Sequence, residues 1–133
     1  MRRFLIITIT IFICFSCSKK FSNGFYEPKN EVYLMDDKIG KIKRNDFDLI
    51  NPYLRSDQIS RLNEIISDTS LHLTTDLGTC EISGVFILDD KTIYLTCGTS
   101  QIFISDKKYT YHILLTELGN NKLFSLVKEI KNK

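Results

Sequence analysis

The stretch "CEISGVFILDDKTIYLTC", residues 80–97, decides the fold of this chain. It holds two apolar runs of strand length on either side of Asp89–Asp90, a pair that favours a tight turn. A two-residue turn there places Phe86 opposite Ile93, so that the apolar side chains of both runs share a face. A slip of one residue would destroy that agreement, and the stretch therefore predicts a β-hairpin.

The two cysteines that flank the hairpin are predicted to form a disulfide, although this register does not by itself join them. Cys97 lies opposite Ile82, and Cys80 is only diagonal to Cys97, at ~7–8 Å. A disulfide requires Cβ atoms about 4 Å apart, so a bulge or a strand end at Gly78–Thr79 is needed. Two cysteines in an oxidising compartment are typical of one disulfide. A reactive-thiol or metal pair is the alternative, and no adjacent cysteine or well-placed histidine favours it.

Short strands are predicted on both sides of the hairpin. The segment "LHLTTDL" (71–77) alternates upstream, and "QIFIS" (101–105) and "YTYHILL" (109–115) follow downstream across short turns. Residues 31–44 have room for two more strands around a turn at Asp36–Asp37. Because the connections are short, the simplest topology is a sequential antiparallel meander of about four to six strands.

Two segments change from strand periodicity to helical periodicity. Residues 56–68 begin at Ser56, a candidate N-cap, and their apolar side chains form one stripe: Ile59, Leu62, Ile65 and Ile66. Residues 120–133 carry a second stripe, made of Leu123, Leu126, Val127 and Ile130. A final strand after a turn at Gly119–Asn120 is the competing prediction for this last segment.

These elements predict an α+β fold. An antiparallel meander sheet would carry one helix from the N-terminal half of the chain and one C-terminal helix, both packed on one face. Before the first helix, in residues 45–54, the spacing of Phe47, Ile50 and Leu54 predicts a short helical turn that packs on the core. Pro52 disfavours a helix through Asn51.

The N-terminus has the features of an export signal. Arg2 and Arg3 precede "FLIITITIFICF" (residues 4–15), which is too short for a comfortable membrane span, and Ser16–Cys17 follows. This arrangement resembles the lipobox of bacterial lipoproteins, and the resemblance covers residues 1–17. It implies cleavage before Cys17 and a lipid on its sulfur. An ordinary signal peptide and an uncleaved anchor are the alternatives, and nearly all of these place the domain outside the cytoplasm.

The expected organisation has three parts: a signal peptide (1–16), a lipidated cysteine with a flexible tether (17–30), and one domain (31–133). Removing residues 1–16 takes away Arg2 and Arg3 and no acidic residue. The chain then changes from 18 basic and 16 acidic residues to 16 of each. A neutral domain gives no argument for nucleic-acid binding. The resemblance to lipoproteins also implies a sorting preference, because Ser18 after the cysteine, rather than Asp, favours the outer membrane over the inner one under the rule that some bacteria use.

The remaining chemistry is sparse. The two histidines, His72 and His112, fall in predicted strands, whereas a zinc site needs three or four ligands in matched spacing. We therefore predict no metal, no cofactor and no catalytic residue. Tyr109 and Tyr111 share one strand face and form a candidate binding face, because tyrosine is enriched at interfaces. A half-buried sheet face is the alternative interpretation.

The sequence thus favours a lipid-anchored envelope protein that acts by binding another macromolecule, in an inhibitor or immunity role for example. A structural or scaffolding lipoprotein is the first alternative. A hydrolase acting on envelope polymers is the second, and it would need His72, His112 and a carboxylate such as Asp76 to converge in one cleft.

Overall fold

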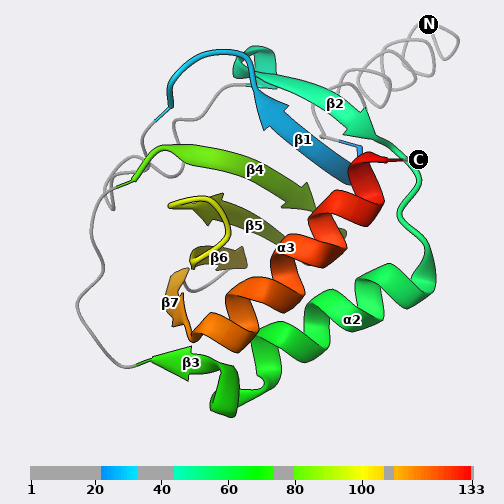
Figure 1. The fold of residues 1–133 in the computed structure, drawn as a ribbon. Coiled ribbons are helices and arrows are strands. Elements are labelled where there is room, and N and C mark those ends of the chain that lie inside the picture. The colour runs from blue at the N-terminus through cyan, green and yellow to red at the C-terminus, as the bar shows by residue number, and fades with distance from the viewer. Residues whose placement is uncertain (1–21, 33–43, 74–79, 107–109, 133) are drawn as a thin grey trace, which may run out of the picture.

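The computed structural model describes residues 22–32, 44–73, 80–106 and 110–132. It shows an antiparallel sheet of seven strands with two helices side by side on one face (Figure 1). The strand order is β2-β1-β4-β5-β6-β7-β3. The predicted α+β class is confirmed, and the sheet has more strands than the four to six expected from the sequence.

The strands are β1 (Gly24–Pro28), β2 (Phe47–Asn51), β3 (His72–Leu73), β4 (Ile82–Ile87), β5 (Lys91–Thr96), β6 (Gln101–Asp106) and β7 (Thr110–Leu115). The helices are α2 (Ser56–Ser67) and α3 (Glu117–Lys131), and two short 3-10 turns are η3 (Arg44–Asp46) and η4 (Thr69–Leu71). The predicted sequential order of the strands is correct only in the centre of the sheet, from β4 to β7.

The hairpin of β4 and β5 has the predicted register, with Phe86 paired to Ile93. The Leu88 N–H donates to the Lys91 carbonyl at 2.9 Å, which closes the two-residue turn. The register shifts by one between Ile82 and Gly84. This irregularity supplies the bulge that the cysteine pair requires, and it lies within β4 rather than before it.

The predicted tether is wrong for residues 24–28, because these residues form β1 inside the sheet. This strand lies between β2 and β4, and Phe25 is fully buried. Its ring packs against Phe86 with the centroids 4.9 Å apart. A Cβ at Gly84 would lie 2.8 Å from the Phe25 ring, so the glycine makes room for it. The folded domain therefore starts before residue 31.

The helical turn predicted in residues 45–54 is also wrong, because Phe47–Asn51 is an edge strand paired with β1. Phe47 is buried, whereas Ile50 is exposed at the position where the register of β1 and β2 shifts. A short edge strand with an irregular register is a common way to end a sheet.

Both predicted helices are confirmed, with differences at their starts. The N-cap of α2 is Arg55 rather than Ser56, and the Arg55 N–H donates to the Gln58 side chain at 3.0 Å. The helix α3 begins at Glu117, so Gly119 lies in its first turn, and the competing prediction of a final strand after a Gly119–Asn120 turn is wrong. The side chain of Thr116 caps α3 by accepting from the Gly119 N–H at 3.2 Å.

The core has two parts, one on each face of the sheet. Under the helices, the sheet contributes Phe25, Phe86, Ile93 and Ile102, and the helices contribute Leu62, Ile65, Leu123, Leu126 and Ile130. The other face carries a second buried cluster of Tyr26, Phe47, Ile82, Val85, Tyr94 and Phe103.

The two strands predicted within residues 31–44, together with Cys17, Asp76 and Tyr109, lie outside the described residues, apart from Glu31, Val32 and Arg44.

Candidate binding site between the two helices

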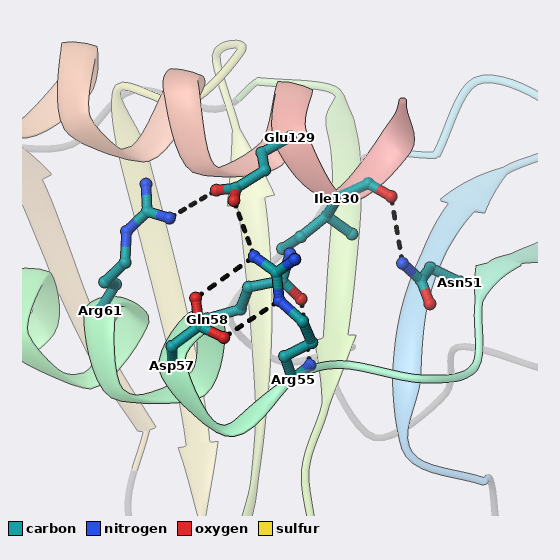
Figure 2. Close-up of polar contacts among 7 residues, drawn as sticks. All are labelled: Asn51, Arg55, Asp57, Gln58, Arg61, Glu129 and Ile130. Atoms are coloured by element: carbon teal, nitrogen blue, oxygen red, sulfur yellow. Dashed lines mark hydrogen bonds and ion pairs between the residues drawn. The ribbon is translucent and has the colours of Figure 1, made fainter. Parts of the chain in front are cut away.

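The outer surface of the helix layer carries a group of ion pairs that joins α2 to α3 (Figure 2). Arg55 Nε lies 3.0 Å from Asp57 Oδ1, and Arg55 Nη2 lies 2.8 Å from Glu129 Oε1. Arg61 Nη1 bonds the second oxygen of the same carboxylate. Glu129 of α3 is thus held between two arginines, Arg55 just before α2 and Arg61 within it.

These contacts explain the electrostatics of the group. The pKa of Glu129 is lowered, first by the hydrogen bond from Arg61 and further by Arg55. The pKa of Arg55 is raised, chiefly by its hydrogen bond to Asp57. All of these side chains are well exposed to water, so each pair contributes little stability by itself.

A buried polar contact lies beside the ion pairs (Figure 2). The Asn51 side chain donates to the Ile130 carbonyl at 3.1 Å and accepts from the Tyr53 N–H at 2.8 Å. It satisfies one of the carbonyls that a helix leaves open at its C-terminus. The end of β2 and the end of α3 are therefore joined.

A pocket of about 400 Å³ opens between α2 and α3. Arg61, which pairs with Glu129, also lines this pocket. Its apolar wall includes Ile65 and Leu71, both of which belong to the buried core. Its polar wall is formed by Arg61, Glu64, Asn121, Lys122 and Ser125. An apolar wall bordered by charges and amides is suited to an apolar side chain of a peptide together with its polar neighbours.

The rim of this pocket continues into η4. Asp68 accepts from the Ser70 N–H at 3.0 Å and from the Ser70 hydroxyl at 2.7 Å. These bonds lower the pKa of Asp68, and the charge of Lys122 adds to the effect. His72 Nε2 lies 3.2 Å from the Ile65 carbonyl and joins β3 to α2. The pocket thus has a rim of both signs of charge.

A second hollow of about 530 Å³ lies at one end of the sheet, beside the cysteines. Glu27, Glu81, Ser83 and Cys97 are among its lining residues. The Ser83 hydroxyl bonds the Gly98 carbonyl, and the Glu27 carboxylate pairs with Lys131 at 2.6 Å. The lining of this hollow is more polar than that of the pocket between the helices, so we take the pocket between the helices as the candidate binding site.

The structure brings together one predicted pair of residues and separates another. Cys80 and Cys97 have Cα atoms 5.1 Å apart, a disulfide-bonding distance. His112 packs against Phe103 in a tilted arrangement on the sheet face opposite the helices, with ring centroids 3.9 Å apart. His72 contacts α2 on the helix side. The two histidines cannot share a cleft, and the hydrolase that depended on them is not supported.

Tyr111, from the candidate binding face, is exposed near the rim of the helix-covered sheet face, where it pairs with Ile104. Its neighbour Ile113 packs against the core under the helices. The predicted face is therefore continuous with the core. The sequence gives no local signal for the pocket, because Arg61 and Glu64 lie outside the apolar stripe of residues 56–68.

Comparison with known proteins adds no assignment. No protein family, no curated protein and no solved structure matches this chain.

Among the described residues, no cluster of His, Cys, Asp or Glu is arranged to hold a metal ion. No helix of the described part combines the length and the apolar character that crossing a membrane requires.

Proposed function

We propose that this chain is an exported protein of the cell envelope, anchored by lipid on Cys17 in the outer membrane, that acts by binding another protein. The pocket between α2 and α3 is the proposed contact site. A disulfide between Cys80 and Cys97 accompanies the proposed location, because such bonds persist in oxidising compartments. The N-terminal resemblance to lipoproteins supports the location.

The observation that carries the binding role is the composition of the pocket. The buried side chains of Ile65 and Leu71 reach its wall, whereas Arg61 and Lys122 stand at its polar side. An anchor side chain inserted between fixed helices gains affinity without ordering the site first. Buried side chains of both helices, Leu62 and Ile65 from α2 and Leu123 from α3, pack in one core cluster that sets this separation.

A site-specific photocrosslink tests the binding role. A photoreactive amino acid replaces Ser125, which lines the pocket. The matched control replaces Ser60, an exposed serine of α2 that does not line it. In intact cells, we expect one discrete adduct from the Ser125 position and a much weaker one from the Ser60 position. Equal adducts at both positions, or none at either, would contradict binding at the pocket.

Intact mass tests the location separately. Protein extracted from bacterial membranes should begin at Cys17 with acyl chains attached, and two thiols should appear only after reduction. A mass that begins at Met1, or two thiols that are free without reductant, would contradict the proposed anchor or the proposed disulfide respectively.

A further inference from the structure

The position of β1 leaves little chain between the proposed lipid site and the folded domain. From Cys17 to Gly24 the chain advances seven residues. A fully extended chain of that length spans at most about 25 Å. A domain of ~100 residues has a radius of gyration of about 13 Å, which corresponds to a sphere roughly 34 Å across, so this reach is shorter than the diameter of the domain. The end of the domain that holds Gly24 therefore lies within about 25 Å of the proposed lipid site.

The elements at that end are identified by direct contacts. A Cβ on Gly24 would lie 2.6 Å from the Asn51 carbonyl oxygen and 2.9 Å from the Leu49 side chain. Asn51 in turn bonds the Ile130 carbonyl at 3.1 Å. The start of β1, the end of β2 and the C-terminus of α3 thus lie together, and Figure 1 shows them on one side of the molecule.

Exposed apolar side chains gather at this end. Tyr53 is 74% exposed, Leu49 42% and Ile50 39%. Tyrosine with aliphatic neighbours is the composition that proteins place at the membrane–water boundary. Arg55 pairs with Asp57 at 3.0 Å, and the Asp89 carboxylate accepts from the Asn23 side chain at 2.8 Å beside the start of β1. The apolar side chains at this end therefore lie next to acidic groups, and a contact with the bilayer would depend on the apolar side chains.

We propose that Leu49, Ile50 and Tyr53 rest on the bilayer surface that carries the lipid anchor. This inference depends on the anchor of the proposed function and adds an orientation to it. Along α3, Leu118 lies twelve residues from Ile130, which corresponds to about 18 Å of helix. Asn121 and Lys122 of the pocket belong to the half of α3 nearer Leu118, so this part of the pocket would lie farther from the membrane than the C-terminus of α3.

The chain contains no tryptophan, so a single introduced tryptophan reports its own surroundings. The reporter is Tyr53→Trp, and the matched control is Leu118→Trp, which replaces a side chain that is 58% exposed at the far end of α3. Full-length lipidated protein is reconstituted into phosphatidylcholine vesicles whose acyl chains carry bromine, a short-range quencher. Flotation of the vesicles measures anchoring in the same sample.

We expect bromine to quench the Tyr53→Trp variant several-fold more than the Leu118→Trp variant. A second change, Ile50→Asp, should reduce that quenching, whereas Leu118→Asp in the same Tyr53→Trp background should not. Equal quenching of the two tryptophan variants in protein that floats would overturn the orientation and leave the anchor standing. Protein that does not float would overturn both the anchor and the orientation.

Discussion

Replacing Phe25 by alanine should destabilise the domain strongly, because β1 is an interior strand of the sheet, paired on both sides. The side chain is fully buried and packs on Phe86 and Gly84. Truncation of a buried phenylalanine costs about 3–5 kcal/mol. Loss of the contact between the Phe25 and Phe86 rings contributes roughly 0.5–1.5 kcal/mol to that cost. Domains of this size are stable by about 5–15 kcal/mol, so a large share of the total would be lost.

Urea unfolding followed by circular dichroism measures this effect, and the free energy of unfolding is obtained by linear extrapolation. Phe124→Ala is the matched control, because Phe124 is exposed on α3 and its truncation should change the free energy of unfolding by less than about 0.5 kcal/mol. If Phe25→Ala cost no more than Phe124→Ala, residues 24–28 would be a tether, and the sheet order described above would be wrong.

Three further changes test other parts of the structure. Replacing both Cys80 and Cys97 by serine should lower the free energy of unfolding by about 3 kcal/mol, because the bond closes a loop between residues 17 positions apart; an unchanged denaturation midpoint would show that the bond does not form. Asn51→Ala should cost about 1–3 kcal/mol in the same assay, since the Ile130 carbonyl loses a buried donor. Because the pKa of Glu129 is lowered in the folded protein, its ion pairs stabilise the fold at pH values above the ordinary pKa of 4.5. This stability is lost as the pH falls through the lowered pKa. Glu129→Gln should therefore lose less thermal stability than the parent on acidification below pH 4.5, and identical pH profiles would argue against the ion pairs.

The elements that were predicted correctly depend on local patterns. The hairpin could be read from the sequence because its turn fixes which residues face each other, so that Phe86 meets Ile93 within a few residues of chain. The helix α3 could be predicted because its stripe repeats every three or four residues, and Leu123 and Leu126 are buried accordingly. The starts of the helices were less certain, because a cap depends on a few hydrogen bonds rather than on a repeat.

The two wrong predictions concern strands that are held by distant partners. The segment "GFYEP" has the glycine and proline of a linker, and only its pairing with β4 and β2 makes it a strand. Phe47, Ile50 and Leu54 have helical spacing, yet pairing with β1 imposes an extended backbone on Phe47–Asn51. Contacts between segments far apart in the chain overrode the local preference in both cases.

The sequence by itself determined the α+β class, the central hairpin and the two amphipathic helices, because each depends on a repeat within a short segment. Only the tertiary structure decided that His72 and His112 lie on opposite faces, because strand pairing sets the side on which each residue points. It also decided that Arg61, Leu71 and Lys122 surround one pocket, since that arrangement exists only when α2, η4 and α3 pack together. Helix periodicity specifies which face is buried, and packing specifies which residues of different helices meet.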